Sequence, residues 1–387
     1  MENVKGFKDI DGEEARIREK VKEILIKNFK LYGFSPVETP IIEYEDFVKG
    51  NNQNDEVISD IFKLQDKGKR NLALRYELTF QLKRLYKNKK LPFKRYQIGE
   101  VFRDEPTSSN RFRQFTQCDV DIVGSTIKDE AEILSLAKNI LDELNVKATI
   151  YINNRKLLNE ILDSEEIKNK EEVIREIDKL DKITEEEVRL KLKKYNAEKI
   201  LEIFKQKESF FEKYPSYKEI IELKDWCNLY GVKVNFLPNL ARGLSYYNGN
   251  VFEIKSNEMK ETIIAGGSYM IDNIQSTGIS FGLERLSKLA KIETKENFVL
   301  VISLNQDKES INLLKELRKN KIYCSIMYGK PSKALEYANY YKIPYVIFVG
   351  EEEIKTKKFK IKDMVIGKEK LMDKNKLIKY LLSNAIN

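Results

Sequence analysis

The sequence predicts an α+β protein in which an antiparallel sheet is interrupted by a helical insertion and followed by a separate α/β domain. Three observations support this prediction. Strand-like segments joined by polar loops occur before residue 155 and again after residue 230. The chain between them, to about residue 225, is dense in Glu, Lys, Ile and Leu and almost without Gly or Pro. Beyond it, two continuous apolar runs, NFVLVIS and IPYVIFVG, are typical of strands buried on both faces.

Length and composition narrow the class of protein. A chain of 387 residues is too long for one compact core, so we expect two or three domains. With 41% hydrophobic and 34% charged residues it is typical of soluble globular proteins, and no run approaches the roughly 20 apolar residues of a membrane helix. The opening residues, MENVKGFKDIDGEE, lack the apolar core of a secretory signal. The cysteines lie far apart, as in a reducing compartment, so we expect a cytoplasmic protein with no membrane partner.

The chain contains no histidine, which excludes several kinds of catalytic site. Ser-His-Asp and Cys-His nucleophile systems and His-ligated zinc are impossible, and the cysteines form no CxxC pair. The phosphate-binding patterns GxxxxGK(S/T) and GxGxxG are also absent. Any chemistry therefore uses carboxylates, Arg, Lys, Tyr, backbone amides or a bound metal ion, and no residue is singled out as a metal ligand. The net charge of +8 is a modest indication of a polyanionic partner.

The N-terminal segment predicts a long helix followed by short extended elements. Apolar residues recur at helical spacing from Glu13 onward, and Gly33 ends the helix. Pro36 and Pro40 exclude a helix in the next segment, GFSPVETPIIEYEDFV. Further on we expect strands at 62–64 and 72–74 and an amphipathic helix from Glu77.

The segment Arg95–Gly124, RYQIGEVFRDEPTSSNRFRQFTQCDVDIVG, predicts two antiparallel strands joined by a polar loop. Alternation along the second strand places a polar set on one face and a mainly apolar set on the other. The polar face carries Arg113, Phe115, Gln117, Asp119 and Asp121, with Arg111 close by. A solvated face is one interpretation, and the floor of a charged-ligand site is the other. Arg beside a flat aromatic ring suits a nucleotide, and Asp suits a cationic or hydrogen-bonding group.

The remaining elements follow from the same patterns. Ser125 or Thr126 caps a helix with apolar residues at helical spacing. The region 155–225 is either a separate helical module or one long charged helical hairpin. Strands are expected at 232–236, 249–255, 261–265 and 278–281, with a helix from Gly282. The expected boundaries are 1–154 and 231–294 for the two parts of the sheet domain, 155–230 for the insertion and 295–387 for the last domain.

Five segments of the chain resemble those of class II aminoacyl-tRNA synthetases and occur in the same order. GFSPVETPIIEYEDF is similar to motif 1 of that class, the Arg95–Gly124 unit to motif 2, and TGISFGLERL, Thr277–Leu286, to motif 3. Two more segments narrow the resemblance to the histidyl-tRNA synthetases: RYELT, Arg75–Thr79, and LARGLSYYNGNVFEI, Leu240–Ile254. The likeness covers nearly the whole chain.

This resemblance implies a class II catalytic domain built on an antiparallel sheet. The helical insertion would embrace the tRNA acceptor stem, and the C-terminal α/β domain would be the anticodon-binding domain. The implied activity is that of a histidine–tRNA ligase, which uses ATP and Mg²⁺ to convert L-histidine to histidyl-adenylate and then charges the 3′ end of tRNA(His). Because motif 1 builds the dimer interface in this class, a homodimer is expected.

The resemblance implies two catalytic arginines. Arg103 matches the motif 2 arginine on the α-phosphate of ATP, and Arg242 matches the arginine that lies against the reacting carboxylate and that phosphate. In-line attack of a carboxylate on the α-phosphate needs positioning and neutralisation of charge, and no protein nucleophile. A chain without histidine can therefore catalyse it.

The implied ATP site contains four further residues. Glu105 would accept a hydrogen bond from the adenine amino group, and Phe115 would stack on adenine. Arg111 and Arg285 would meet the outer phosphates.

The implied histidine site consists of acidic, amide and tyrosine side chains. Its members are Glu77, Thr79, Gln117, Asp121, Arg242, Tyr246, Tyr247, Gly266 and Tyr269. The first three would surround the α-ammonium group, with Glu77 and Gln117 holding it. Asp121 and Tyr247 would bind the two imidazole nitrogens, because each needs a partner when buried. The others would line the pocket, although Tyr246 can equally be a core residue.

Three positions depart from the family pattern. Ser245 stands in RGLSYY where the family usually has Asp. Ser268 and Met270 stand in AGGSYM where Arg and Asp are usual. These changes beside the substrate site indicate either compensated drift, with Ser245 and Ser268 changing together, or weakened catalysis.

Other functions are also compatible with the sequence. A catalytically silent paralogue would bind histidine or tRNA as a sensor, as does a regulatory subunit of ATP phosphoribosyltransferase in this family. Such subunits usually lack the anticodon domain, whereas this chain has a full segment at 295–387. A relative that charges another amino acid, such as a prolyl-, threonyl- or glycyl-tRNA synthetase, is the alternative enzyme. The RGLSYY segment together with Asp121 argues against it.

Overall fold

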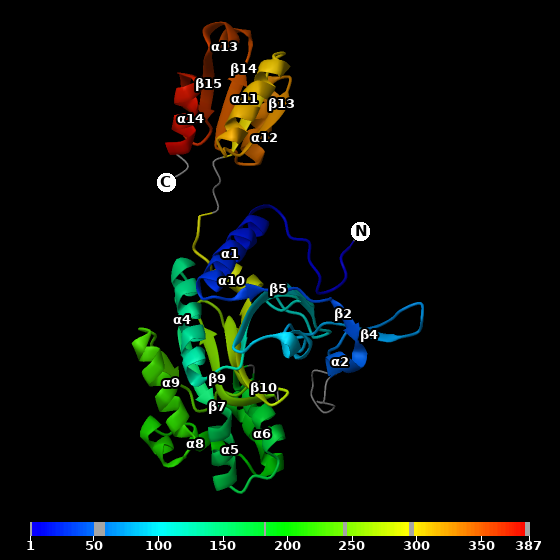
Figure 1. The fold of residues 1–387 in the computed structure, drawn as a ribbon, viewed down its shortest axis with the longest axis vertical. Coiled ribbons are helices and arrows are strands. Elements are labelled where there is room, and N and C mark those ends of the chain that lie inside the picture. Colours follow the sequence, from blue (N-terminus) through cyan, green and yellow to red (C-terminus); the bar gives the residue numbers. More distant parts are fainter. Residues whose placement is uncertain (1, 50–58, 182, 243–245, 294–297, 384–387) are drawn as a thin grey trace. The chain divides into compact units, whose positions relative to one another are not determined.

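The computed structural model describes residues 2–49, 59–181, 183–242, 246–293 and 298–383 (Figure 1). The chain divides into two compact units, Met1–Ile292 and Glu293–Asn387. Each unit has its own buried apolar clusters and is described by itself. The helical insertion belongs to the first unit.

An eight-stranded sheet forms the centre of the first unit, and most of its neighbouring strands are antiparallel. The strand order is β1 (Ser35–Pro36), β5 (Phe93–Phe102), β6 (Gln114–Val123), β11 (Ile274–Gly282), β10 (Ile264–Ile271), β9 (Tyr247–Lys255), β7 (Thr149–Asn154) and β8 (Val234–Phe236). Parallel pairs occur at its two edges, β1 with β5 and β7 with β8. The predicted α+β class with an antiparallel-rich sheet is therefore confirmed.

Helices cover one face of this sheet. They are α1 (Gly12–Leu31), α4 (Ile127–Glu143) and α10 (Leu283–Leu289). Cys118, Val120 and Ile122 of β6 are fully buried in the same apolar cluster as α1 and α4 residues. Because neighbouring strand residues point to opposite faces, Asp119 and Asp121 lie on the other side, away from these helices.

A two-residue turn closes the hairpin of β10 and β11. Ile271 pairs with Ile274, and the residues between them, Asp272 and Asn273, have φ values of 44° and 67°. Asp and Asn tolerate this left-handed region, and turns of this kind match the twist of paired strands. The strands therefore extend to this turn, beyond the predicted ranges 261–265 and 278–281.

The chain between β1 and β5 forms a separate, small three-stranded sheet. Its order is β2 (Ile42–Tyr44), β4 (Asn71–Leu74) and β3 (Lys63–Gln65), and α2 (Glu45–Lys49) follows β2. The predicted helix from Glu77 is wrong in extent, because only α3 (Leu82–Leu85) and the 3₁₀ turn η2 (Tyr86–Asn88) are helical. The Glu77 side chain instead accepts a hydrogen bond from the Phe80 backbone N–H at 3.1 Å, and its carboxyl group is buried.

The insertion consists of several short helices and is not one long hairpin. They are α5 (Arg155–Ser164), α6 (Lys170–Ile177), η3 (Asp178–Asp181), α7 (Glu185–Leu192), η4 (Lys193–Tyr195), α8 (Ile200–Ile203), η5 (Glu208–Lys213) and α9 (Tyr217–Leu229). Their buried faces, including Leu158, Ile161 and Leu223, join the apolar cluster of the first unit. The charged residues that dominate this region therefore occupy the outer faces of short amphipathic helices.

The second unit is a five-stranded sheet with helices on both faces. The strand order is β13 (Cys324–Tyr328), β12 (Val299–Ser303), β14 (Tyr345–Val349), β15 (Lys358–Asp363) and β16 (Glu369–Asp373). The helices are α11 (Asp307–Lys319), α12 (Pro331–Tyr340), α13 (Glu351–Thr356) and α14 (Lys374–Ser383). Along β12, Val299 and Val301 belong to one apolar cluster and Leu300 and Ile302 to another. This strand is buried on both faces, as its continuous apolar run predicts.

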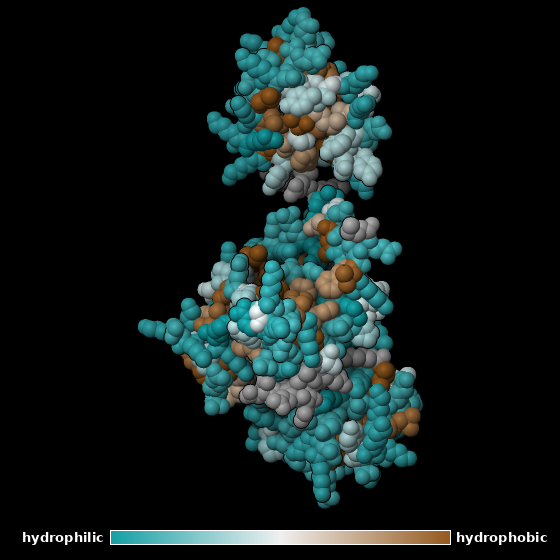
Figure 2. All heavy atoms as spheres, turned by 90° about the vertical axis from the view of Figure 1, so that its right-hand side faces the viewer, coloured by the Kyte–Doolittle hydropathy of each residue, from teal (hydrophilic) through white to brown (hydrophobic). Residues whose placement is uncertain are grey.

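Hydrophilic side chains dominate the surface of both units on the face drawn in Figure 2, with apolar residues scattered among them. Within the described parts of the chain, no helix is both long enough and apolar enough to span a membrane.

Candidate active site

A cavity of about 710 Å³ lies over the polar face of the first unit's sheet. Strands β6, β9, β10 and β11 all contribute to its wall. All the residues that the family resemblance assigns to the site line this one cavity: Glu77, Thr79, Arg103, Glu105, Arg111, Phe115, Gln117, Asp121, Arg242, Tyr246, Tyr247, Gly266, Tyr269 and Arg285. The fold therefore gathers side chains that are up to about 200 positions apart in the sequence.

The floor of the cavity comes from β6 and depends on a glycine in the neighbouring strand. Asp121 of β6 stands opposite Gly278 of β11. A Cβ atom on Gly278 would lie 2.1 Å from Oδ1 of Asp121. Gly278 thus makes the space in which the Asp121 carboxyl group lies.

Three carboxyl groups are buried together in the cavity wall. Glu77, Asp119 and Asp121 are 4%, 3% and 2% exposed. Burial and the neighbouring Asp119 raise the pKa of Glu77 to about 7. Burial likewise raises the pKa of Asp119 to about 7, with Asp121 adding to the shift. Such a cluster favours a bound cation, because a positive charge relieves the repulsion among the ionised carboxylates.

Asp119 lies on the polar face that strand alternation predicts, although the family resemblance does not assign it to the site. Among the described residues its buried Oδ1 atom has no hydrogen-bond partner, and neither does Oε1 of Gln117. The amide of Gln117 donates to Ser280 Oγ at 3.0 Å, which orients its oxygen. The alternation of β6 already indicates Asp119, since it lies between Gln117 and Asp121 on one face.

Asp121 is held by two partners. Arg95 forms an ion pair with it at 2.5 Å, and the Tyr269 hydroxyl donates a hydrogen bond to its other oxygen. Burial raises the pKa of Asp121, and Arg95 opposes the shift. Burial also raises the pKa of Tyr269 well above its usual range, so this phenol stays a neutral donor.

Tyr246, Tyr247 and Tyr269 form an aromatic cluster beside these carboxyl groups. The Tyr246 ring centroid lies 4.8 Å from that of Tyr247 and 5.5 Å from that of Tyr269. The Tyr246 hydroxyl also donates to Glu77 at 3.1 Å. Tyr246 therefore both packs against apolar neighbours and contacts a predicted substrate-binding residue.

Arg103 lies between two aromatic rings. Its guanidinium carbon is 4.2 Å from the ring centroid of Tyr76 and 5.1 Å from that of Phe115. This sandwich holds a planar cation in place by cation–π attraction. The charge of Arg103 also lowers the pKa of Glu77 and of Arg285, so this guanidinium faces both the carboxyl cluster and the other arginines.

Arg111 and Arg285 are the other two arginines near Arg103, and they add positive charge to the cavity wall. Arg111 forms an ion pair with Glu105, and Arg285 donates to the Thr262 carbonyl at 2.6 Å. Burial lowers the pKa of Arg285, with Arg103 and Arg111 contributing in the same direction. Three arginines that repel one another suit a polyanion such as a triphosphate.

Arg242 connects the cavity to the helical insertion. Its guanidinium donates to Glu253 at 2.8 Å, and Lys255 lies 3.2 Å from the same carboxylate. Lys255 also forms a 2.5 Å ion pair with Asp181 of the 3₁₀ turn η3. The insertion thus contributes to the cavity wall, with Arg175, Asp178, Lys179 and Asp181 among the lining residues. The sequence does not predict these contacts, because the many charged residues of the insertion indicate an outer surface.

Ser245, Ser268 and Met270, the three residues that depart from the family pattern, differ in their surroundings. Ser268 is buried and donates a hydrogen bond to Glu130 of α4, outside the cavity wall. Met270 is 42% exposed. Ser245 lies outside the described residues.

Oxygen donors for a metal ion are present beside the arginines. Glu261 and Glu284 line the cavity and interact electrostatically with Arg285. One oxygen of Glu284 already accepts hydrogen bonds from Arg18 and from the Thr116 backbone N–H. Within the described ranges, no group of three or more Cys, Asp or Glu side chains is arranged as a complete metal site. This donor set fits Mg²⁺, which takes one or two carboxylates together with substrate phosphates and water.

Comparison with known proteins gives two matching family models. The model described as histidyl-tRNA synthetase matches residues 6–286, and the model described as anticodon binding domain matches residues 298–384. The histidine–tRNA ligase 1 of Bacillus cereus is 38% identical, over 95% of this chain and 94% of that protein. The histidine–tRNA ligase of Clostridium tetani is 32% identical, over 98% and 97%.

Solved structures show the same fold. A histidyl-tRNA synthetase from Nostoc sp. PCC 7120 superposes with a TM-score of 0.84 and 24% identity, covering 99% of both chains. A protein from Bacillus halodurans titled as an ATP phosphoribosyltransferase regulatory subunit/histidyl-tRNA synthetase has a TM-score of 0.73 and 20% identity, covering 87% of this chain and 96% of that one.

Proposed function

We propose that this chain, which belongs to the histidyl-tRNA synthetase family, is a histidine–tRNA ligase. It activates L-histidine with ATP and then transfers the amino acid to tRNA(His). The observation that carries the proposal is the division of one cavity into a carboxyl cluster and an arginine cluster, with Arg103 facing both. An amino acid with a cationic end fits the first cluster, and a triphosphate fits the second.

The histidine subsite lies at the carboxyl cluster. Glu77 and Gln117 hold the α-ammonium group, and Asp119 adds negative charge beneath it. Asp121 and Tyr247 bind the imidazole ring, with Tyr269 fixing the position of Asp121 through its hydrogen bond. The burial of these groups supports this assignment, because a buried polar cluster without a ligand partner is unfavourable.

The ATP subsite lies at the arginine cluster. Phe115 stacks on adenine and Glu105 accepts from its amino group, while Arg111 and Arg285 bind the outer phosphates. Glu105 and Arg111 are paired with each other, so ATP binding in this way replaces one ion pair by contacts with base and phosphate.

Catalysis rests on positioned charge. Arg103 and Arg242 hold the attacking carboxylate of histidine against the α-phosphate and stabilise the negative charge that develops there. Glu253 and Tyr247 hold Arg242 in place, since Arg242 donates to Glu253 at 2.8 Å and lies 5.9 Å from the Tyr247 ring centroid. Glu261 and Glu284 would face Mg²⁺, which neutralises phosphate charge when bound.

The tRNA contacts are distributed over the chain. The match of residues 298–384 to an anticodon-binding domain supports anticodon recognition by the second unit. The insertion, which reaches the cavity through Asp181, is suited to the acceptor stem. Contacts with phosphates predict that tRNA binding weakens steeply as salt rises.

A homodimer is part of this proposal. The motif 1 segment exposes several large apolar side chains, with Ile41, Ile42 and Tyr44 being 42%, 50% and 58% exposed. An interface would bury this group. Sedimentation equilibrium tests the assembly, and a monomer at micromolar concentration would contradict it.

A regulatory subunit that senses histidine is the second candidate, because the Bacillus halodurans relative is described as an ATP phosphoribosyltransferase regulatory subunit/histidyl-tRNA synthetase. Charging of a tRNA(His) transcript with labelled histidine separates the two. A ligase attaches histidine to the 3′ end with multiple turnovers, whereas a sensor binds histidine without forming the ester. The absence of charging by protein that binds both histidine and tRNA would exclude the ligase.

A further inference from the structure

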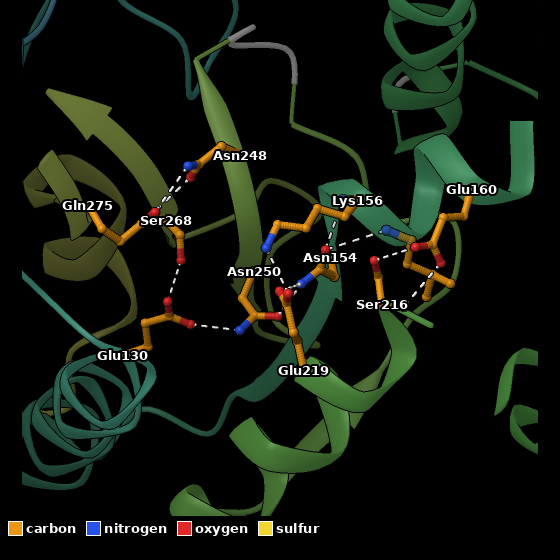
Figure 3. Close-up of polar contacts among 11 residues, drawn as sticks. Glu130, Asn154, Lys156, Glu160, Ser216, Glu219, Asn248, Asn250, Ser268 and Gln275 are labelled. Atoms are coloured by element: carbon orange, nitrogen blue, oxygen red, sulfur yellow. Dashed lines mark hydrogen bonds and ion pairs between the residues drawn. The ribbon is translucent and has the colours of Figure 1, made fainter. Parts of the chain in front are cut away.

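Glu130 of α4 contacts both strands that carry the tyrosines of the cavity. Its carboxyl group is buried on the helix-covered side of the sheet and is not part of the cavity wall. One oxygen accepts a hydrogen bond from Ser268 Oγ of β10. The other accepts from the side-chain amide of Asn250 of β9 at 2.8 Å. Figure 3 shows the carboxyl group between these two side chains.

The pairing of β9 and β10 is irregular at this place. Gly267 pairs with Val251, and the next recorded pair is Tyr269 with Tyr247. Ser268 alone therefore stands opposite the three residues 248–250. Such a bulge interrupts the ladder of backbone hydrogen bonds and bends the strand, which re-aims the side chains that follow it.

The bulge makes two tyrosines of the cavity register partners on neighbouring strands. Tyr247 and Tyr269 are the residues that resume the pairing, and both line the cavity. The neighbouring contacts are tight: a Cβ on Gly249 would lie 3.1 Å from Ser268 Cβ, and one on Gly267 would lie 2.9 Å from the Tyr247 ring. Small shifts of either strand therefore change where these rings lie.

Glu130 and its two hydrogen bonds, to Ser268 and Asn250, form a bridge between β10 and β9. Further side-chain hydrogen bonds connect this bridge to the helical insertion. Asn250 Oδ1 accepts from the Asn154 amide at 2.9 Å, and that amide also donates to Glu219 at 2.8 Å. Lys156 donates to the same Glu219 carboxylate at 2.7 Å. Asn154 caps α5 and Glu219 lies on α9, so the bulge is tied to the base of the insertion.

We propose that Glu130 is a positioning residue for histidine recognition: its carboxyl group joins β9 to β10 across the bulge and thereby sets Tyr247 and Tyr269 in the cavity wall, with the Tyr269 hydroxyl on Asp121. The inference rests on the proposed function, since it concerns the histidine subsite. It also gives a role to the departure at residue 268, because Ser268 supplies the hydroxyl donor that reaches Glu130.

Two variants of nearly equal volume test the bridge. In Glu130→Gln, the amide accepts from Asn250 and donates to the Ser268 hydroxyl, so both strands stay joined. In Glu130→Met, the volume remains but both hydrogen bonds are lost. We expect Glu130→Met to raise the KM for histidine about tenfold in ATP–pyrophosphate exchange, with the KM for ATP changed less than about twofold, and Glu130→Gln to stay within about 1.5-fold of the wild type. Equal changes in both KM values, or the same result for Gln and Met, would overturn the proposal.

Controls separate positioning from general stability. Ile133→Val removes a buried methyl group from the same helix, so it lowers the unfolding temperature and leaves the KM for histidine unchanged. If Glu130→Met does not fold, Ser268→Ala removes one of the two hydrogen bonds and is expected to raise the KM for histidine about threefold. A larger rise in the KM for histidine in Ile133→Val than in Ser268→Ala would contradict the positioning role of Glu130.

A crystal structure of Glu130→Met tests the geometry without catalysis. We expect the Tyr269 hydroxyl to lose its hydrogen bond to Asp121. If the wild type gave no exchange with histidine, the proposed function would fail, yet this displacement would still be measurable. An unchanged Tyr269 position would contradict the positioning role by itself.

Discussion

Arg95 and Asp121 form an ion pair of 2.5 Å beneath the cavity, with side chains only 0% and 3% exposed. Arg95 also donates to the Leu78 carbonyl at 2.8 Å, next to the segment that carries Glu77. A single buried cation thus supports two parts of the carboxyl cluster. It explains how three acidic groups can be buried together without disrupting the fold, since one of them is neutralised by a partner.

Removing one partner of this pair is expected to destabilise the protein strongly. Arg95→Leu leaves Asp121 buried without its cation, and we expect the free energy of unfolding to fall by about 3–5 kcal/mol. The double variant Arg95→Leu/Asp121→Leu replaces both charges by apolar groups and should recover much of this loss. Urea unfolding of the wild type, both single variants and the double variant gives the coupling energy. Additive losses would show that the two residues do not stabilise each other.

The specificity of the site for imidazole is expected to depend on Asp121. Asp121→Asn keeps the size of the side chain and an oxygen that can accept from Arg95, but removes the negative charge that faces the ring. We expect the KM for histidine to rise about 10²-fold and the KM for ATP to stay within about threefold. Thr116→Val serves as a control on the same strand, because Thr116 lies on the opposite face and contacts Arg18. A uniform effect of Asp121→Asn on both substrates would show that this assignment is wrong.

Histidine binding is expected to depend on pH through the carboxyl cluster. Burial raises the pKa of Glu77 and of Asp119 to about 7, so both groups are largely protonated at pH 6 and ionised at pH 8. The α-ammonium group binds the ionised forms, and the dissociation constant should fall about tenfold per carboxyl group over this range. Calorimetric titration with histidinol, which keeps the amine and the ring, measures the dissociation constant at each pH. The contribution of its ring is subtracted with the pKa of the free ligand, because an imidazole titrates in the same range.

The variant Asp119→Asn separates the contributions of Glu77 and Asp119 to the pH dependence of binding. Asp119→Asn removes a negative neighbour that raises the pKa of Glu77, so the remaining pH dependence should be smaller and its midpoint lower. A dissociation constant that is flat between pH 6 and 8 in the wild type would argue against ammonium binding at this cluster.

Arg242 is expected to act in adenylate formation and to be nearly irrelevant to tRNA affinity. Arg242→Ala should lower the rate of histidine-dependent exchange by about 10²–10³-fold. The fold should tolerate the change, because Glu253 keeps Lys255 as a partner at 3.2 Å. Filter binding of tRNA is the second measurement. Equal losses of exchange and tRNA affinity would remove Arg242 from the reaction and assign it to tRNA binding.

The floor of the site was predictable from the sequence because it lies on one regular strand. Period-two alternation in β6 is enough to place Gln117, Asp119 and Asp121 on one face and Cys118 and Val120 in the core. Arg103 and Arg285, which come from different segments, could be assigned only through the family resemblance, since no local pattern brings them together.

Other parts of the site depend on tertiary structure. The opposition of Tyr247 and Tyr269 requires a bulge that strand alternation does not reveal. The contribution of Asp181 follows from the packing of short helices that look like an outer surface in the sequence. The helix expected from Glu77 is replaced by irregular chain where Glu77 turns inward, because burial of its carboxyl group in the cavity wall outweighs local helix propensity.

ATP–pyrophosphate exchange, measured with each amino acid separately in the presence of Mg²⁺, tests the central claim most directly. We expect exchange with histidine alone, which would also show that Ser245, Ser268 and Met270 are compatible with catalysis. No exchange with any amino acid, from protein that still binds histidine, would contradict the ligase and favour a histidine sensor.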